Sequence, residues 1–344
     1  MNETSRTPFD VLVVGAGPVG LACALEASRQ GLSHVVLEKG SLLNTLVRWP
    51  TFTVFFSTPE LLEIGGVPFV TAATKPTRRE GLVYYRKVAE RAGLNLRLSE
   101  RVLNIERGSG FFTVATPKSR HRARKVILAT GFYDNPNRLG VSGEDLPKVS
   151  HYYTEPFRHA GTDVLVVGGK NSAVEAALDL HRNGARVTMA VRKPAFGKSV
   201  KYWLLPDIQN RVKEGSIRAF FETTVEAIAP SSVRMKTAGE DVEIPNDFVF
   251  ALTGYHPDFD FLKNAGIAVT EELQVVHDPD TMETNVPGLY VAGVVAAGVE
   301  IGKLFIENGR VHAVQIVKHI LDVEGRPAAG PLVAPPIKRF RDGD

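Results

Sequence analysis

Buried strands that run into glycine-rich turns recur along this chain. In the first of them, Val11–Val14 are apolar without polar alternation, as expected for a parallel strand that is covered on both faces. Gly15, Gly17 and Gly20 follow at G-x-G-x-x-G spacing, and an apolar helical stretch, Val19–Gln30, comes next. This order of strand, glycine-rich turn and helix predicts the opening unit of a dinucleotide-binding domain.

The three glycines have separate physical purposes in such a turn. The first permits the tight turn, the second lets the backbone approach a pyrophosphate, and the third lets the helix pack closely on the strand. The phosphates then lie at the helix N-terminus, where free N–H groups and the helix dipole favour negative charge. The next strand, His34–Leu37, is followed by Glu38, whose carboxylate can hold the two hydroxyls of an adenosine ribose.

This pattern occurs twice in the sequence. Asp10–Gly15 and Asp163–Gly168 both read DVLVVG, and an apolar strand leads into Thr130–Gly131 in the first half and into Thr253–Gly254 in the second. We therefore predict an α/β fold with two nested, Rossmann-like dinucleotide-binding domains, each built in three layers. The expected domains are a discontinuous one, residues 1–133 with 257–344, and a continuous one, residues 134–256.

The stretch between the repeats gives further elements. The amphipathic segment Lys75–Ala92 predicts a helix. Leu94–Arg107, Phe111–Ala115 and Lys125–Leu128 predict strands, of which the middle ones form a small antiparallel layer. We expect these elements to complete the first domain.

Two segments outside the repeats could reach a bound cofactor. Thr284–Gly298 predicts a turn, a buried strand and a glycine-rich crossover into a helix over Ile301–Leu321. The N-terminus of that helix could stabilise negative charge on a reduced flavin. Gly40–Phe69 is rich in aromatic residues, Trp49 among them, which would either wall a flavin ring or pack in the core.

The second glycine-rich turn, Gly168–Ala173, reads GGKNSA and departs from the first. Lys170 replaces the middle glycine, which weakens the close backbone approach but adds a positive charge near a phosphate. Alanine replaces the last glycine, a change that the motif tolerates. We expect Asn171 and Ser172 to cap the helix that follows, Ala173–Asn183.

The charge after the second strand distinguishes the two repeats. In the second repeat, Ala185–Val191 ends in Arg192 and Lys193, whereas Glu38 stands at this place in the first. A carboxylate suits a free ribose, and an arginine suits a 2′-phosphate. The first unit should therefore bind an adenosine with free ribose hydroxyls, and the second should prefer NADPH to NADH. The alternative is that Arg192 and Lys193 merely end a strand in solvent.

Composition and charge narrow the function classes. The 344 residues are 44% hydrophobic and 23% charged, as in a globular protein large enough for two domains. A net charge of +3 gives no reason to expect nucleic acid as a partner. No apolar run approaches the ~20 residues of a membrane span, and the first ten residues, MNETSRTPFD, hold no signal-peptide core, so we expect no membrane association.

The chain has a single cysteine, Cys23, so it can form no intrachain disulfide, and we expect a cytoplasmic location. Cys23 lies in the apolar stretch LACALEA, where a free thiol either packs in the core or serves as a redox group near the cofactor. We keep Cys23 as the one candidate catalytic residue. The nine histidines show no spacing typical of metal ligands, so no metal site is expected.

The two nested units, the turn Ala129–Gly131 and the sequence NVPGLYVAG that ends at Gly293 resemble the thioredoxin-reductase-like flavoprotein superfamily. Within it, the chain is most similar to the bacillithiol disulfide reductase family, and the similarity covers almost the whole length. The segments that carry it are FFSTPELLEIGGVPF (Phe55–Phe69), KPTRREGLVYYRKV (Lys75–Val88), GEDLPKVSHYYTEPF (Gly143–Phe157), GGKNSA (Gly168–Ala173), SVKYWLLPDIQNRV (Ser199–Val212) and LFIENGR (Leu304–Arg310).

The resemblance implies an FAD-dependent NADPH oxidoreductase, usually a homodimer, with FAD in the first domain and NADPH in the second. Hydride then passes from NADPH to the flavin, and the reducing equivalents leave to a low-molecular-weight disulfide, bacillithiol disulfide. We expect the FAD contacts at Gly15, Gly17, Pro18, Val19, Gly20, Glu38, Lys39, Trp49, Val102, Ala129, Thr130, Gly131, Gly293 and Val294. We expect the NADPH contacts at Gly169, Lys170, Asn171, Ser172, Ala173, Arg192 and Lys193.

Three places depart from this resemblance. The Cys-x-x-Cys pair of true thioredoxin reductases falls on Tyr152 and Glu155, which excludes a dithiol relay. Val19 stands where the bacillithiol disulfide reductases usually carry a cysteine, and Val294 where the wider superfamily usually has an aspartate that contacts FAD. Two alternatives therefore stay open: a ferredoxin– or flavodoxin–NADP reductase of the same fold, whose acceptor is a small redox protein, and a non-enzymatic NADPH/FAD redox sensor.

Overall fold

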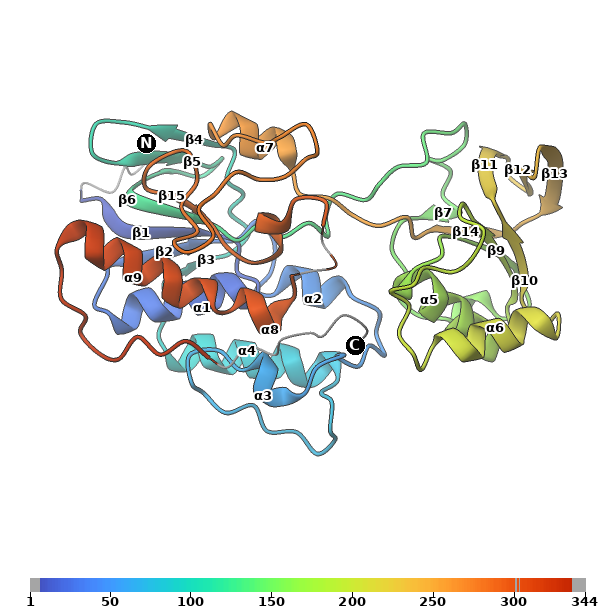
Figure 1. Cartoon of the computed structure of the whole chain (residues 1–344), viewed down its shortest axis with the longest axis horizontal. Helices are drawn as coiled ribbons and strands as arrows, with labels where there is room; N and C mark the ends of the chain where they lie inside the picture. Colours follow the sequence, from blue (N-terminus) through green and yellow to red (C-terminus); the bar gives the residue numbers. More distant parts are fainter. Residues whose placement is uncertain (1–6, 301, 303, 336–344) are drawn as a thin grey trace. The chain divides into compact units, whose positions relative to one another are not determined.

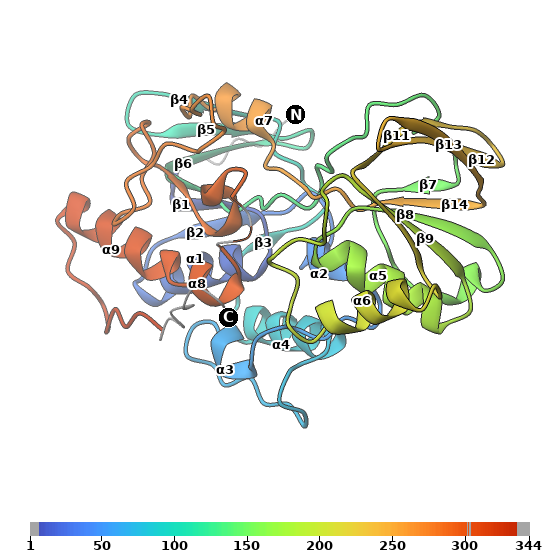
Figure 2. The same cartoon turned by 45° about the vertical axis from the view of Figure 1, so that its right-hand side comes forward.

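A computed structural model describes residues 7–300, 302 and 304–335 of the chain. The chain divides into two compact units (Figures 1 and 2). The first unit comprises Met1–Arg48, Thr53–Asn135 and His256–Asp344, and the second comprises Trp49–Phe52 and Pro136–Tyr255. In Figure 1 the second unit is mainly the green and yellow part of the chain.

The first unit is built on a mixed sheet whose strands lie in the order β3-β2-β1-β6-β5-β4, with β15 also paired to β6. Neighbours from β3 to β6 run parallel, whereas β4, β5 and the start of β6 are antiparallel. The strands are β1 (Phe9–Val14), β2 (His34–Leu37), β3 (Leu96–Arg97), β4 (Asn104–Arg107), β5 (Phe112–Ala115), β6 (Arg120–Leu128) and β15 (Leu289–Val291).

Strand β6 joins the two parts of this sheet. Its first half pairs with β5 in antiparallel register, and its second half, from Val126 to Leu128, pairs with β15 in parallel register. The predicted small antiparallel layer is therefore confirmed, but the predicted strand Leu94–Arg107 is two strands, β3 and β4. Residues 98–103 lie between them and include Ser99, whose φ of +51° interrupts an extended chain.

The first two predicted helices of the first unit are present, and their starts differ from the prediction by one residue for α1 and by three for α4. Helix α1 begins at Pro18, packs on β1, β2 and α9, and buries Leu21 and Cys23 completely. Helix α4 begins at Arg78, later than predicted, because Thr77 forms a capping box with Glu80. The helices are α1 (Pro18–Arg29), α2 (Asn44–Arg48), α3 (Pro59–Leu62), α4 (Arg78–Arg91), α7 (Phe259–Asn264), α8 (Ile306–Gly309) and α9 (His312–Glu324).

The end of the chain differs from its prediction. In place of one helix over Ile301–Leu321 there are two helices, α8 and α9, with Arg310 and Val311 between them. Ile301 itself lies outside the described residues. Before them, β15 is followed by a short 3₁₀ helix, η2 (Gly293–Ala297), as the glycine-rich crossover.

The second unit repeats the core of the first. Its parallel sheet has the order β10-β9-β8-β14-β7. The first four strands of this order correspond one by one to β3-β2-β1-β6 of the first unit, so β8 takes the place of β1. The predicted α/β fold with two Rossmann-like units is confirmed. The elements are β7 (Val149–Ser150), η1 (Phe157–His159), β8 (Asp163–Val167), α5 (Asn171–Arg182), β9 (Arg186–Val191), α6 (Leu205–Lys213), β10 (Arg218–Phe221) and β14 (Phe248–Ala251).

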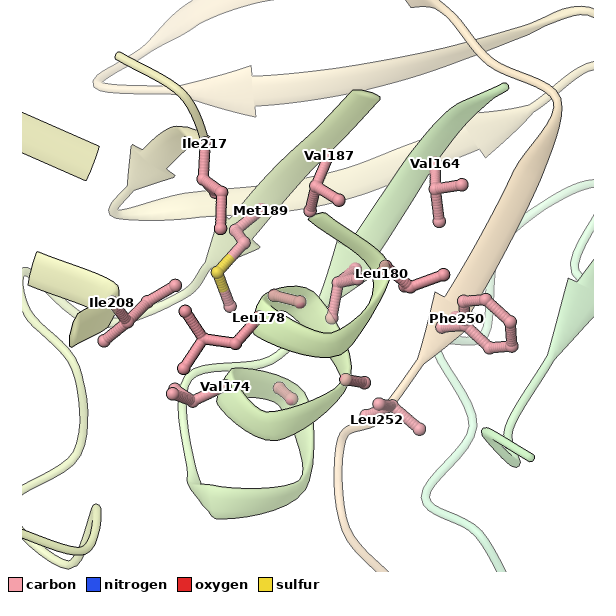
Figure 3. Packing of buried hydrophobic residues seen from close by; sticks show 14 of the residues in the cluster. Val164, Val174, Leu178, Leu180, Val187, Met189, Ile208, Ile217, Phe250 and Leu252 are labelled. Carbon is pink, nitrogen blue, oxygen red and sulfur yellow. The ribbon is translucent and has the colours of Figure 1, made fainter. Parts of the chain in front are cut away.

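Figure 3 shows the core between the helices and the sheet of this unit. Val174 and Leu178 of α5 meet Ile208 of α6 and Met189 of β9, and all four are buried. Because the apolar face of α5 packs in this core, the helix is held in place, and so is the glycine-rich turn from which it begins.

A separate antiparallel sheet, β11-β12-β13, belongs to the second unit and was not predicted from the sequence. Its signal is the alternation of buried Val233 and Met235 with exposed neighbours, followed by a tight turn at Ala238 and Gly239, both with positive φ. The strands are β11 (Thr223–Ile228), β12 (Ser232–Thr237) and β13 (Glu240–Pro245).

Candidate cofactor-binding sites

The first glycine-rich turn has the geometry that a dinucleotide requires. Gly15 has a φ of +108°, and a Cβ added to it would lie 2.5 Å from the Ala129 oxygen. A Cβ on Gly20 would lie 2.0 Å from the Gly15 oxygen, so only glycine allows α1 this close to the turn. A Cβ on Gly17 would meet none of the described atoms within 4 Å. The middle position is therefore an open cradle at the N-terminus of α1.

Glu38 is held beside this turn by its own hydrogen bonds. Its Oε2 accepts from the Ala16 N–H at 2.9 Å and its Oε1 from the Gly40 N–H at 2.8 Å. The residue is buried, at 6% exposure, directly after β2. Each carboxylate oxygen has a second lone pair, so the side chain can still accept from two hydroxyls. This arrangement fits the ribose role expected of it.

Other residues of the first unit gather around the same turn from distant parts of the chain. Ala129 follows β6, and its N–H donates to the Val14 oxygen. A Cβ on Gly131, which has a φ of +69°, would lie 4.0 Å from Val294 Cγ2. The sheet therefore brings the ends of β1, β6 and β15 together, as expected for one site at their carboxyl edge.

Some expected FAD contacts have other partners in the structure. The Lys39 ammonium forms an ion pair with Asp134 at 2.8 Å, and Arg48 pairs with the same carboxylate. Val102 is buried, at 7% exposure. Trp49 falls in the short stretch that groups with the second unit, so the structure does not unite it with the first-unit residues.

The Val19 side chain packs closely against Gly293 and Gly309, where there is room for it only because these residues have no side chain. A Cβ added to Gly293 would lie 3.1 Å from Val19 Cγ2, and a Cβ added to Gly309 would lie 3.3 Å from the same atom. Gly293 has a φ of +72°, which favours glycine. The start of α1, the turn after β15 and helix α8 therefore meet at this one side chain.

Cys23, the candidate catalytic residue, is a free and fully buried cysteine. It lies on α1 with no exposed surface, and burial raises the pKa of its thiol to about 12. A thiolate is the reactive form of cysteine, so this environment suppresses its chemistry. The burial of Cys23 favours the core-packing alternative over the redox alternative, and its catalytic role stays an untested prediction.

The second glycine-rich turn is closed where the first is open. Gly168 has a φ of +138°, and its added Cβ would lie 2.5 Å from the Leu252 oxygen. An added Cβ on Gly169 would lie 2.6 Å from Val191 Cγ1, so this glycine serves packing against β9. Lys170 is the N-cap residue of α5 and has an exposed side chain. The position that was open at Gly17 therefore carries a cation here.

The prediction that Asn171 and Ser172 cap α5 is wrong, because the N-cap residue is Lys170. The helix begins at Asn171, so Asn171 and Ser172 lie within its first turn and not before it. The Asn171 amide instead donates to the Ser199 oxygen at 3.0 Å, and its carbonyl accepts from the Lys201 N–H at 2.9 Å. Sequence spacing could not show this role, because both partners lie some thirty residues away in a loop.

The loop after Arg192 and Lys193 belongs to the same site. The Gly197 N–H donates to the Gly169 oxygen at 2.8 Å, which ties this loop to the turn. Arg192 and Lys193 are exposed after β9, and the loop adds Lys198 to them. The turn before α5 and the loop tied to it therefore carry several exposed cations, a setting that suits a polyphosphate.

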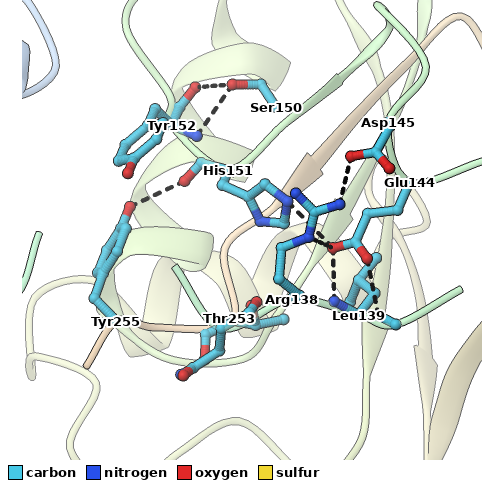
Figure 4. A network of polar contacts seen from close by, with 11 residues as sticks. Arg138, Leu139, Glu144, Asp145, Ser150, His151, Tyr152, Thr253 and Tyr255 are labelled. Carbon is cyan, nitrogen blue, oxygen red and sulfur yellow. Dashed lines mark hydrogen bonds and ion pairs between the residues drawn. The ribbon is translucent and has the colours of Figure 1, made fainter. Parts of the chain in front are cut away.

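The segment that carries the cysteine pair in thioredoxin reductases is a network of polar and aromatic contacts here (Figure 4). The Tyr152 ring stacks on Tyr255 at 5.8 Å between centroids, and the Tyr255 hydroxyl donates to the His151 oxygen at 3.0 Å. Nearby, the buried Glu144 carboxylate accepts from the backbone N–H groups of Leu139 and Gly140. This segment has a structural role and holds no sulfur.

The described residues offer neither a metal site nor a membrane-spanning helix. No group of three or more histidine, cysteine, aspartate or glutamate side chains in this part of the chain could hold a metal ion. Within the same residues, no helix has the length and apolarity needed to cross a membrane.

Comparison with known proteins gives the family. The sequence profile of the pyridine nucleotide-disulphide oxidoreductases matches residues 12–293. The chain belongs to this family. It is therefore an oxidoreductase, and enzymes of the family use FAD and a nicotinamide nucleotide.

Individual relatives refine the comparison. The chain is 42% identical over 312 residues to bacilliredoxin reductase of Bacillus subtilis, which covers 90% of this chain and 96% of the relative. The structure matches bacillithiol disulfide reductase from Bacillus cereus with a TM-score of 0.91 and 40% identity, over 92% of this chain and 100% of that one. A ferredoxin–NADP reductase of Lactococcus lactis is 29% identical over 298 residues, which are 83% of this chain and 85% of the relative. The resemblance to the bacillithiol disulfide reductase family is confirmed.

Proposed function

We propose that this chain is an FAD-containing reductase that uses NADPH to reduce a low-molecular-weight disulfide, bacillithiol disulfide. The observation that carries the proposal is the similarity along nearly the whole chain to bacillithiol disulfide reductase from Bacillus cereus, at 40% identity and a TM-score of 0.91. The overall reaction consumes NADPH, a proton and one disulfide, and yields NADP⁺ and two thiols.

FAD would lie in the first unit. The open backbone at Gly17 and the N-terminus of α1 would receive the pyrophosphate, and Glu38 would accept from the adenosine ribose. Gly131 and Gly293 lie at the ends of the neighbouring strands, where backbone atoms without a side chain can approach a flavin. The domain assignment, residues 1–133 with 257–344, is part of this proposal.

NADPH would lie in the second unit, residues 134–256. Lys170 at the N-terminus of α5 would neutralise the pyrophosphate, and Arg192 with Lys193 would bind the 2′-phosphate that distinguishes NADPH from NADH. Asn171 would act indirectly, because both ends of its amide hold the loop at Ser199 and Lys201.

The two cofactors supply the redox chemistry when they are bound, and the residues of this chain bind and orient them. No thiol of the enzyme takes part in our proposal, because the one cysteine, Cys23, is buried with a raised pKa. The disulfide would then be reduced without an enzyme–substrate disulfide. We further propose a cytoplasmic homodimer, which the resemblance to this family supports.

A second candidate is a ferredoxin– or flavodoxin–NADP reductase. It is favoured by the same lack of an accessible thiol, since a small redox protein can take electrons without one. It is disfavoured by identity, which is 29% to the ferredoxin–NADP reductase of Lactococcus lactis and 42% to the bacilliredoxin reductase.

An acceptor panel separates the two candidates. The purified protein, loaded with FAD, is assayed for NADPH oxidation with bacillithiol disulfide, ferredoxin, flavodoxin and a quinone. We expect bacillithiol disulfide to give the highest kcat/KM. Turnover with ferredoxin or flavodoxin but not with the disulfide would replace our proposal by the second candidate.

The variant Cys23→Ser is the control for the thiol-free route. We expect it to reduce the disulfide at the wild-type rate, because the thiol is inaccessible. A large loss of disulfide reduction in a variant that still binds FAD and still oxidises NADPH with a quinone would show that Cys23 participates.

A further inference from the structure

A buried histidine holds the turn that follows β15. The Gly293 N–H donates to Nδ1 of His312, the first residue of α9, at 3.1 Å. The histidine is 8% exposed. Because the backbone amide is the donor, Nδ1 must be unprotonated, and the proton of the neutral ring lies on Nε2. Burial lowers the pKa of His312 to about 4, which keeps this acceptor available at neutral pH.

The corner between α8 and α9 is anchored independently of that turn. The buried Arg310 guanidinium donates to the backbone oxygen of Glu60 at 3.1 Å and to that of Glu63 at 2.5 Å. Glu60 lies within α3, and Glu63 directly follows it. The buried Glu307 accepts from the Ser57 hydroxyl at 2.5 Å. These bonds fix the corner to α3, so His312 presents its acceptor from a rigid element.

Gly293 itself has little freedom on its other sides. Its Cα lies 3.1 Å from where a Cβ on Gly309 would be, and Val19 fills the space beside it. Its φ of +72° is maintained between these contacts and the bond to His312. The His312 acceptor is the polar partner that the Gly293 N–H has in this packed region.

We propose that His312 is a positioning residue for the flavin, acting through the backbone of Gly293 and Val294. This inference rests on the proposed function, which places FAD beside Gly293, and on the sequence-based expectation that Val294 also contacts FAD. Without an acceptor at this point, the buried Gly293 N–H would be unpaired, and the turn would relax to find another partner. The turn would then lose the conformation in which it meets the flavin.

The test compares three replacement side chains at position 312. In His312→Asn the amide oxygen can take the place of Nδ1, whereas in His312→Gln the oxygen lies one bond further out and in His312→Leu no acceptor exists. The control is His319→Leu, which changes another histidine of α9. It removes the contact at 3.1 Å between His319 Nδ1 and the hydroxyl of Tyr290 on β15. The readouts are the Kd for FAD and the visible absorption spectrum of the bound flavin.

We expect His312→Leu and His312→Gln to weaken FAD binding about tenfold or more and to shift the flavin spectrum. His312→Asn should stay within about threefold of wild type with an unchanged spectrum, and so should His319→Leu. If His312→Leu does not fold, His312→Gln against His312→Asn gives the same comparison.

Three outcomes would overturn the inference: wild-type affinity and spectrum in both His312→Leu and His312→Gln, equal losses in His312→Asn and His312→Gln, or an equal loss in His319→Leu. In each of these, wild-type protein still binds FAD, so the proposed function stands. A wild-type protein that binds no FAD would instead contradict the proposed function itself.

Discussion

Glu38 and Arg192 occupy corresponding places, each directly after the second strand of its unit, and their charges are opposite. The structure shows the carboxylate fixed by two backbone N–H groups and the arginine exposed, ready for a ligand of opposite charge. In our proposal, these two single charges determine which nucleotide each unit prefers.

Arg192→Ala should therefore change cofactor preference. We expect the KM for NADPH to rise about tenfold or more, because a charge-assisted bond to the 2′-phosphate is lost, and the KM for NADH to stay nearly constant. Steady-state kinetics with both nucleotides measure this. Arg234→Ala, which removes an exposed arginine from β12, is the matched control and should leave both constants unchanged. Equal changes for NADPH and NADH in Arg192→Ala would refute the assignment.

The thiol of Cys23 gives a second prediction for a single residue. Because Cys23 has no exposed surface and a raised pKa, an aromatic disulfide reagent should label no thiol in the native protein within minutes and one thiol per chain in denaturant. Absorbance of the released thiolate counts the groups. Rapid labelling of the native protein would contradict the packing that we describe.

At the scale of elements, the glycine-rich turns and the strands that flank them were predictable, because apolar runs, glycine spacing and the DVLVVG repeat are local signals. The start of α4 was less so, since Thr77 and Glu80 form a cap that shortens the amphipathic stretch. The antiparallel sheet β11-β12-β13 was missed, although its strands carry the alternation of buried and exposed residues that is typical of a solvent-facing layer.

A buried carboxylate links elements of the first unit. Glu100 Oε1 accepts from the hydroxyls of Thr116 and Ser119 at 2.9 and 2.8 Å, and His121 Nε2 lies 2.7 Å away. Burial by itself would raise the pKa of Glu100, but the hydrogen bonds from His121, Ser119 and Thr116 together lower it below its usual 4.5. The loop between β5 and β6 is thereby tied to Glu100, which lies in the segment between β3 and β4.

The lowered pKa makes a prediction about pH. A carboxyl with a depressed folded-state pKa contributes stability above its unfolded value and loses it as the pH falls through the folded value. We expect the free energy of unfolding in urea to decline from about pH 5 downward, and to decline less steeply in Glu100→Gln. Parallel slopes for wild type and Glu100→Gln between pH 6 and pH 3 would show that this carboxyl contributes nothing to the pH dependence.

For the whole molecule, the sequence repeat is a repeat of topology, with β3-β2-β1-β6 in one unit and β10-β9-β8-β14 in the other. That correspondence was predictable because both copies open and close with the same motifs. The convergence of Val19, Gly293, Gly309 and His312 was not, since it depends on how α8 and α9 return to α1, and no local pattern encodes that return. The role of Asn171 as a clamp on a distant loop was hidden for the same reason.

The central claim is that this molecule passes reducing equivalents from NADPH to a flavin held by its first unit. The most direct measurement is an anaerobic titration of the purified, FAD-loaded protein with NADPH, followed by visible absorbance. Our account predicts that NADPH bleaches the flavin band with about one equivalent, that NADH does so much more slowly, and that bacillithiol disulfide restores the colour. A protein that binds no FAD, or a bound flavin that NADPH does not bleach, would contradict the account.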